Sequence, residues 1–276
     1  MLIDFDHHTH TIYSTHSDPD MTVENNLAAA AEAGLRRHVI LEHVPEIGQN
    51  RPTVESWYRG KDERPQLDAI ARDLKNLRPA ERYPQLTVLR GVELDADPIT
   101  LDGSAMLGDL SGIDVVLGST HVFPGGAAFW FDKVSLPPDA AMRVALQWRD
   151  WAIRFMASGV VDVMSHPGDL VGARQLVPPF NTHETLQFFR PLLEALGEHG
   201  VAFELNELLA SKFPPAYRNG YVELVRQARQ VGLKFSVGSD AHAPAQIGQY
   251  AWVLDLIDQA GLEPGDFWKP ESKQGG

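Results

Sequence analysis

The stretch Leu2–His10, LIDFDHHTH, decides how the rest of the chain is interpreted. It begins with a short run, Leu2–Asp6, that is predicted to be a strand, and it ends in histidines. His8 and His10 are two residues apart, so on an extended backbone their side chains point the same way and can bind one metal ion. The stretch therefore predicts a strand that is followed directly by metal ligands.

Further short runs rich in Val, Ile and Phe follow, and longer helical stretches separate them. This alternation favours parallel βα units in one α/β domain. The other predicted strands are His38–Leu41, Thr87–Val92, Asp114–Gly118, Val161–Met164, Ala202–Leu205 and Lys234–Val237. Such a series of units predicts a closed, TIM-like barrel, with a doubly wound open sheet as the alternative.

The chain shows no linker or internal repeat, so residues 1–269 are predicted to form a single domain, followed by a disordered tail at Pro270–Gly276. The polar segment Pro45–Pro65 is too long for a routine connection, and we interpret it as an insertion near the site that could act as a lid. Among the helices, one is expected to open with a capping box formed by Asn181 and Glu184 and to end at Gly200.

Composition excludes several classes of protein. The 276 residues include no cysteine, which rules out disulfides, thiolate zinc sites and a cysteine nucleophile. Lys and Arg number 24 against 37 Asp and Glu, and the net charge of −13 disfavours non-specific binding to nucleic acid or to an anionic membrane. Asp4 and Asp6 interrupt the amino-terminal run where a signal peptide needs an apolar core, so we expect a cytoplasmic protein.

Histidines and carboxylates follow almost every predicted strand. The carboxyl ends of the strands in a parallel barrel converge on one face, where active sites are built. The residues at these ends are His8, His10, His16, Glu42, His43, Glu93, His121, His166, Asp240 and His242. They are too many for one ion, and imidazole and carboxylate ligands without thiolate suit Zn, Mn, Fe or Ni better than Ca or Mg. A multinuclear site of this kind splits phosphate esters or amides with a metal-bound hydroxide.

Other histidines and acids are interpreted as structural or solvated. The histidines placed in this group are His7, His38, His183 and His199. The carboxylates placed in it are Asp95, Asp97 and Asp102, which look like a solvated acidic loop.

The order of the strand-end residues resembles the motifs of the PHP (polymerase and histidinol phosphatase) family. From His8 to His242 the order is His-x-His, a further His, Glu-His, Glu, His, His-Pro and Gly-Ser-Asp-Ala-His. The resemblance implies a distorted (βα)7 barrel with its site at the carboxyl ends of the strands. It also implies three divalent transition-metal ions, which could be Zn, Mn or Fe.

The resemblance also implies a ligand set for each ion. One ion would be held by His8, His10, Glu93 and Asp240. Glu93 would bridge to a second ion, which is completed by His121 and His166. The third ion would be held by His16, His43 and His242.

Two motifs resemble the histidinol-phosphatase branch of the family, namely Glu42-His43 and the GSDAHAPAQIG motif that begins at Gly238. Two others depart from it. Ser165–Asp169 reads SHPGD where the resemblance implies Gly-His-x-Asp, and Glu204–Glu207 reads ELNE where it implies Glu-x-Asn-Thr. These departures lie where substrate is selected, so they bear on the substrate more than on the metals.

The resemblance implies a metal-dependent phosphatase that hydrolyses a small phosphomonoester by attack of a metal-bound hydroxide on phosphorus. Histidinol phosphate is the favoured substrate, which would place the protein in histidine biosynthesis. A broader phosphoesterase acting on nucleotides or other small phosphates is the alternative. An amidohydrolase-type C–N hydrolase is less favoured, because such barrels use a modified Lys and fewer histidines, whereas His121 follows the fourth strand here.

The expected partner is a small phosphorylated substrate rather than a membrane or a long nucleic acid, and the oligomeric state is not readable from the sequence. Arg174, Lys212 and Arg218 are the candidates for binding the phosphate from the rim of the site. Asp240 and His242 are the candidates for protonating the leaving alkoxide, and the sequence does not choose between them.

Overall fold

The computed structural model describes residues 3–14, 16–44, 63–97, 100–104, 110–121, 138–169 and 181–270. Within these ranges, neighbouring strands pair in parallel in the order β1-β2-β4-β5-β6-β7-β8, and the short strand β3 also pairs with β4. The strands are β1 Phe5–Thr9, β2 Arg37–Ile40, β3 His43–Val44, β4 Thr87–Asp95, β5 Val115–Ser119, β6 Val163–Met164, β7 Ala202–Asn206 and β8 Phe235–Gly238.

The two ends of this sheet meet. Just after β8, the backbone N–H of Asp240 donates to the carbonyl oxygen of His8 at 2.8 Å. The backbone N–H of His10 donates to the carbonyl oxygen of Ala241 at 3.0 Å. These bonds join the last strand to the first, so the sheet is a nearly closed, distorted (βα)7 barrel of the TIM-like type, and the open sheet is ruled out.

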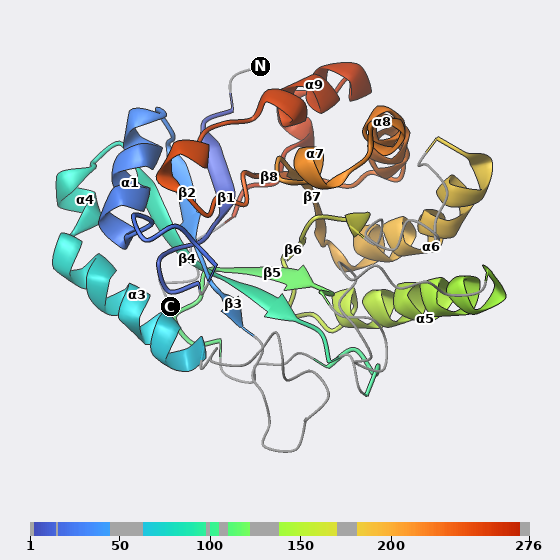
Figure 1. Cartoon of the computed structure of the whole chain (residues 1–276), viewed down its shortest axis with the longest axis horizontal. Coiled ribbons are helices and arrows are strands. Elements are labelled where there is room, and N and C mark those ends of the chain that lie inside the picture. The colour runs from blue at the N-terminus through green and yellow to red at the C-terminus, as the bar shows by residue number, and fades with distance from the viewer. Residues whose placement is uncertain are drawn as a thin grey trace.

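Helices surround the strands, with α1, α3 and α4 on one side of the barrel and α5, α6 and α8 on the other (Figure 1). Their bounds are α1 Val23–Glu32, α3 Glu63–Leu77, α4 Pro79–Arg82, α5 Pro138–Met156, α6 His183–His199, α7 Leu209–Lys212, α8 Pro215–Gln230 and α9 Ala251–Ala260. The expected cap of α6 is shifted by one residue. Thr182 is the extended residue before the helix, and its hydroxyl accepts from the backbone N–H of Thr185 at 3.3 Å.

Alternation along β4 connects the core to the site. Leu89 and Glu93 point into the barrel, whereas Val92 and Leu94 belong to the apolar layer between the strands and the helices. Low in the barrel the inward side chains are apolar and fill the interior, and they are Val39, Leu41, Leu89, Val115, Leu117, Val163 and Ala202. Higher up, the same face of β4 carries a carboxylate. The interior of the barrel thus contains a layer of apolar side chains beneath a layer of polar ones.

The strand that contains the first histidines is shifted toward the carboxyl terminus from the predicted Leu2–Asp6. It runs over Phe5–Thr9, because its parallel partner β2 begins only at Arg37, which pairs with Phe5. His8 therefore lies within the strand rather than after it. The predicted insertion at residues 45–65 lies outside the described residues as far as residue 62, and α3 begins at Glu63. Of the predicted tail, residues 271–276 lie outside them.

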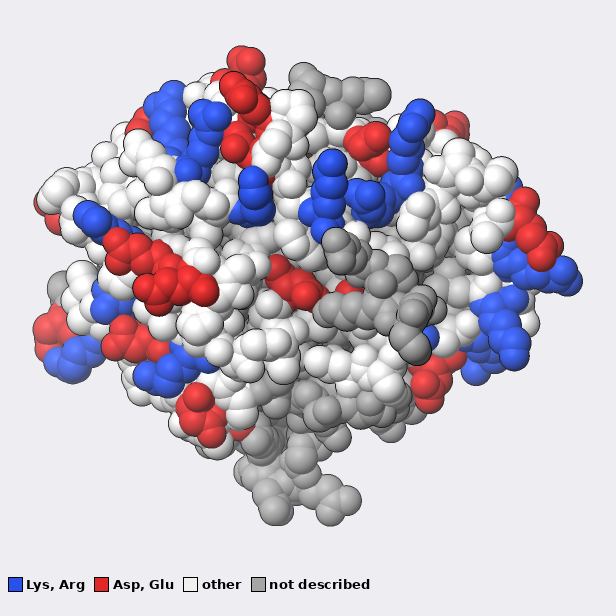
Figure 2. Space-filling model, turned by 180° about the vertical axis from the view of Figure 1, so that it is seen from behind, with Lys and Arg blue, Asp and Glu red and all other residues white. Residues whose placement is uncertain are grey.

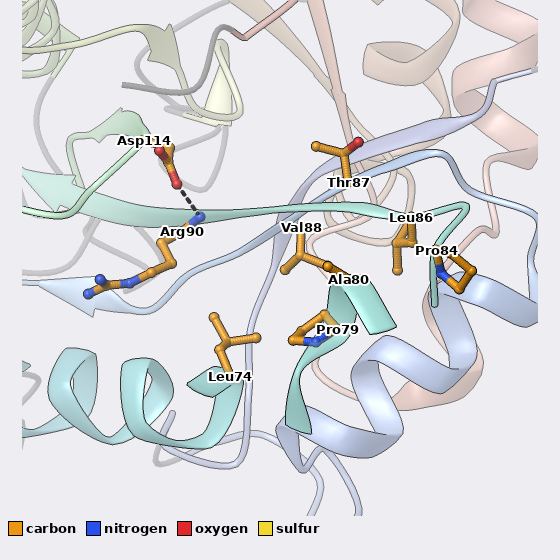
Figure 3. Close-up of a pocket in the computed structure, with 9 residues that line it drawn as sticks. All are labelled: Leu74, Pro79, Ala80, Pro84, Leu86, Thr87, Val88, Arg90 and Asp114. Carbon is orange, nitrogen blue, oxygen red and sulfur yellow. Dashed lines mark hydrogen bonds between the residues drawn. The ribbon is translucent and has the colours of Figure 1, made fainter. Parts of the chain in front are cut away.

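A pocket of about 480 Å³ opens beside the start of β4, between that strand and helices α3 and α4 (Figure 3). Its lining residues are Leu74, Pro79, Ala80, Pro84, Leu86, Thr87, Val88, Arg90 and Asp114. None of them is a predicted metal ligand or substrate-binding residue, so this pocket is separate from the strand-end chemistry. Among the described helices, none combines the length and the apolar character that crossing a membrane requires.

Candidate metal centre

All nine predicted metal ligands are among the described residues, and the strands bring them to one end of the barrel. β1 and the loop after it carry His8, His10 and His16, and β3 carries His43. Glu93 lies near the end of β4, and His121 and His166 follow β5 and β6. Asp240 and His242 follow β8.

Glu93 is the residue that the histidines share. Its Oε2 atom is 3.3 Å from Nε2 of His8 and 3.4 Å from Nε2 of His10. Its Oε1 atom is 3.1 Å from Nε2 of His121 and 2.8 Å from Nε2 of His166. Nδ1 of His43 is also 2.8 Å from Oε2. Each oxygen of one buried carboxylate therefore faces a different group of imidazoles, which is the arrangement of a bridging ligand.

Asp240 completes the first of these groups, because its Oδ1 atom is 3.4 Å from Nε2 of both His8 and His10. Further out, Nε2 of His43 and Nε2 of His16 are 3.4 Å apart. The rings of His10 and His242 stack with their centroids 4.2 Å apart. The histidines of the loop after β1 thus lie against those that follow β2 and β8.

Within the part of the chain that the structure describes, three groups of ligand atoms are compact enough for a metal ion, each with its atoms within 4.8 Å of one another. They are His8, His10 and Glu93; His43, Glu93 and His121; and His10, His43 and His242. His10 and His43 each belong to two groups, whereas the family resemblance assigns each of them to one ion. The groups overlap and form one continuous cluster.

The donor set fits divalent transition metals. All of its atoms are imidazole nitrogens or carboxylate oxygens, which suit Zn, Mn and Fe. Nε2 of His242 is buried and has no hydrogen-bond partner among the described residues. A buried nitrogen without a partner costs free energy unless something else binds it. The cluster therefore has the chemistry of a metal centre.

Comparisons with known proteins agree with this arrangement. A family profile described as PHP-associated matches residues 225–262. A protein named probable phosphatase from Thermoanaerobacter sp. (strain X514) is 26% identical over 268 residues, which cover 95% of this chain and 88% of that protein. Another protein with that name, from Vibrio parahaemolyticus, is 27% identical over 266 residues, with coverage of 95% and 88%.

The chain thus resembles proteins described as PHP-associated and as probable phosphatases. Its fold is shared by a crystal structure from Listeria monocytogenes that is described as the "putative histidinol phosphatase hisK". The TM-score is 0.61 at 18% sequence identity, and the match covers 90% of this chain and 98% of that one. At this identity the likeness concerns the fold alone.

Several carboxylates lie against the outer nitrogens of the histidines. Nδ1 of His8 is 2.8 Å from Oε1 of Glu204, and Nδ1 of His121 is 2.9 Å from Oδ1 of Asp95. Oε2 of Glu42 is 3.8 Å from Nδ1 of His10. Such contacts fix the ring orientation and the tautomer of a metal-binding histidine. The sequence analysis does not assign these roles. For Glu204 a signal exists, because an acidic residue within the apolar run of β7 is unusual.

The prediction of a solvated acidic loop is wrong for two of its three members. Asp95 and Asp97 are buried, with 1% and 0% of their surface exposed, whereas Asp102 is exposed. The physical reason is that β4 continues to Asp95, beyond its predicted end at Val92. Because side chains alternate along a strand, Asp95 lies on the same inward face as Glu93.

The histidines that were interpreted as structural or surface residues lie outside the cluster. Nδ1 of His7 is 2.8 Å from Oγ of Ser236, and burial lowers the pKa of His7 to about 3. His38 is buried beside Asn26, and burial lowers its pKa to about 3 as well. The remaining two, His183 and His199, are exposed at the two ends of α6.

Electrostatics in the cluster favour charged carboxylates. Burial by itself raises the pKa of Glu93, but His43, His121 and His8 outweigh it and hold that pKa well below its usual value. Burial by itself lowers the pKa of His10, but hydrogen bonds to nearby carboxylates raise it to about 10. The carboxylate is therefore in the form that a metal requires, and a bound metal ion would displace protons from the imidazoles.

The three predicted substrate-binding residues have different outcomes. Lys212 lies beside the centre, with its Nζ atom 3.3 Å from Oδ2 of Asp169, and that oxygen is 3.5 Å from Nδ1 of His166. Arg218 is exposed on α8. Arg174 lies outside the described residues. Of the two that the structure describes, Lys212 is the one next to the metal ligands.

Proposed function

We propose that this protein is a member of the PHP family and a metal-dependent phosphatase that hydrolyses a small phosphomonoester. One observation carries the proposal, which is the bridging position of Glu93 between two groups of buried histidines. When bound, divalent ions would lower the pKa of a water molecule toward neutrality and offset the charge of the phosphoryl oxygens. The names of the related proteins, probable phosphatases, agree with this chemistry.

The chain's own residues would bind and orient the phosphate. Lys212 ends the short helix α7 and is aligned by Asp169, so its ammonium group is available at the edge of the ligand cluster. A charge-assisted hydrogen bond from this group would hold a phosphoryl oxygen. Asp240 or His242 would protonate the leaving alkoxide, as both lie at the end of β8 beside the cluster.

The substrate that we propose is histidinol phosphate, which would make this a biosynthetic enzyme of histidine synthesis. The support is the resemblance of Glu42-His43 and of the GSDAHAPAQIG motif to that branch of the family. We also propose that the partner is a small molecule rather than a long nucleic acid. In agreement, Lys and Arg side chains are interspersed with Asp and Glu on the face in Figure 2, without forming a continuous basic track there.

Phosphate release from L-histidinol phosphate, measured beside a panel of sugar phosphates and nucleotides, tests this proposal. The protein would be assayed as purified and after separate loading with Mn²⁺ or Zn²⁺. A clear preference for histidinol phosphate would support the biosynthetic role. Similar activity on many members of the panel would support phosphatase activity but reject histidinol phosphate as the specific substrate. If the metal-loaded protein released no phosphate from any of these esters, phosphatase activity would be rejected and C–N hydrolysis would be favoured.

A further inference from the structure

Glu204 is a fully buried carboxylate on the inner face of β7, which carries Ala202 and Asn206 on the same side. Its Oε1 atom is 2.8 Å from Nδ1 of His8. Because a carboxylate oxygen only accepts hydrogen bonds, Nδ1 of His8 must carry the proton in this contact. The Nε2 atom of His8 is then left with its lone pair directed toward His10 and Glu93.

The other oxygen of Glu204 reaches two further parts of the centre. Oε2 accepts from the backbone N–H of His166 at 2.6 Å and from Nδ2 of Asn206 at 3.1 Å. Nδ2 of Asn206 also donates to Oδ2 of Asp240, at 3.2 Å. One side chain and its neighbour on β7 thus contact three of the predicted metal ligands.

Two of these three ligands have an unusual backbone. His166 has φ 33° and Asp240 has φ 56°, both in the left-handed region that residues other than glycine rarely adopt. Such conformations cost free energy and persist only where surrounding contacts hold them. The bond from the backbone N–H of His166 to Glu204 is a contact of this kind, and it aims the His166 ring at Glu93.

The neighbouring strand leaves space for this contact. A Cβ atom at Gly238 on β8 would collide with Oε1 of Glu204 and with Cβ of His8. The absence of a side chain at this position therefore allows the carboxylate and the imidazole to meet. This requirement is independent of the hydrogen bonds themselves.

We propose that Glu204 is the positioning residue of the centre. It fixes the tautomer of His8 and the backbone of His166, and it thereby aligns ligands on both sides of Glu93. This inference rests on the proposed function only in that the cluster binds divalent metal. Glu204 acts through the ligands and does not itself contact the reacting atoms.

The test compares three variants by competition of Mn²⁺ and Zn²⁺ binding with a chelator, with circular dichroism as the check of folding. Glu204→Gln keeps the size of the side chain but replaces one acceptor with an amide donor. Gly238→Ala changes no ligand residue but crowds both Glu204 and His8, and so disturbs the contact between them. Glu207→Gln is the matched control, because Glu207 accepts from the backbone of Trp252 and Val253 at the start of α9 instead.

We expect folded Glu204→Gln and Gly238→Ala to bind metal about 10-fold to 100-fold more weakly than the parent protein. Glu207→Gln should bind metal as the parent does, even if its thermal stability falls. Unchanged metal affinity in a folded Glu204→Gln variant would overturn the proposal, as would an equal loss in Glu207→Gln. If Glu204→Gln does not fold, Gly238→Ala decides alone by the same criterion.

Metal affinity is measured without any substrate, so this test does not depend on the phosphatase activity. A protein that binds metal as expected but releases no phosphate would reject the proposed function and keep the role of Glu204. An active phosphatase whose Glu204→Gln variant binds metal normally would support the proposed function and reject the role of Glu204.

Discussion

Nε2 of His8 lies 3.1 Å from Nε2 of His10, and both rings are completely buried. The two nitrogens face each other together with oxygens of Glu93 and Asp240, each within 3.4 Å. Two imidazole nitrogens and two carboxylates directed at one point need positive charge between them, which is supplied by protons on the imidazoles or by a bound metal ion. This relationship is the physical basis for a metal site at the end of β1.

Removal of one ligand from this point should abolish activity without unfolding the barrel. We predict that His8→Ala and Asp240→Asn lose phosphate release, because each deletes a ligand of the group that shares Glu93. Elemental analysis of the purified variants should show less bound metal than the parent protein. Full activity in either folded variant would contradict the ligand assignment.

Lys212→Ala should raise KM for phosphorylated substrates about 10-fold to 100-fold, because a charge-assisted hydrogen bond is worth about 1.5–3 kcal/mol. Steady-state kinetics measure this effect. Lys234→Ala is the matched control, since the Lys234 ammonium donates to the carbonyl of Gly265, away from the centre. Arg218→Ala should leave KM unchanged, because that side chain is exposed on α8. An unchanged KM in Lys212→Ala would remove Lys212 from the substrate site.

His38 should make the fold sensitive to acid. Burial lowers its pKa to about 3 from the ordinary value of 6.5, so the unfolded chain binds a proton more readily than the folded one. Above pH 6.5 His38 is neutral in both the folded and the unfolded chain and does not reduce the free energy of unfolding. As the pH falls from 6.5 toward 3, the unfolded chain takes up the proton first, and the free energy of unfolding decreases. Between pH 7.5 and pH 5 the loss should be about 2 kcal/mol in the free energy of unfolding.

The measurement is denaturant unfolding of the parent protein and of His38→Gln at both pH values. The glutamine can still contact Asn26 and does not titrate, while all other groups titrate equally in the two proteins. The stability difference between them should therefore shift by about 2 kcal/mol in favour of the variant on acidification. A constant difference would show that His38 is not the acid-sensitive group.

Glycines at two sites should respond to alanine with opposite signs. A Cβ at Gly91 on β4 would crowd Val39 and lie 3.1 Å from Cβ of Leu41 inside the barrel, so Gly91→Ala should destabilise by about 1–3 kcal/mol. In α6 a Cβ at Gly197 would meet its nearest neighbour, Leu233, at an ordinary 3.5 Å. Gly197→Ala should therefore stabilise by about 0.5–1 kcal/mol through helix propensity. Thermal unfolding distinguishes the two, and destabilisation by both would contradict this account of the packing.

The sequence predicts the barrel and the ligand positions because both depend on local patterns. The alternation of short apolar runs with helices yields the strand order, and residues at strand ends converge whatever the detailed packing is. His8 and His10 are an example, since their spacing of two is sufficient to place them on one side of a strand.

Residues that act through contacts distant in sequence escaped this reasoning. Glu204 contacts His8 across 196 positions, so its role is visible only once the barrel closes. Asp95 was misjudged because the predicted strand ended three residues early, at Val92, and strand ends are where local patterns are weakest. The substrate is harder still to predict, because it depends on side chains at the rim rather than on the ligand cluster.

The central claim is that the cluster around Glu93 binds divalent metals that are needed to release phosphate. The most direct measurement is phosphate release from histidinol phosphate and the substrate panel before chelation, after complete removal of metal, and after adding back Mn²⁺ or Zn²⁺. The account predicts that activity disappears with the metal and returns with it. Undiminished activity in protein shown by elemental analysis to be free of metal would contradict it.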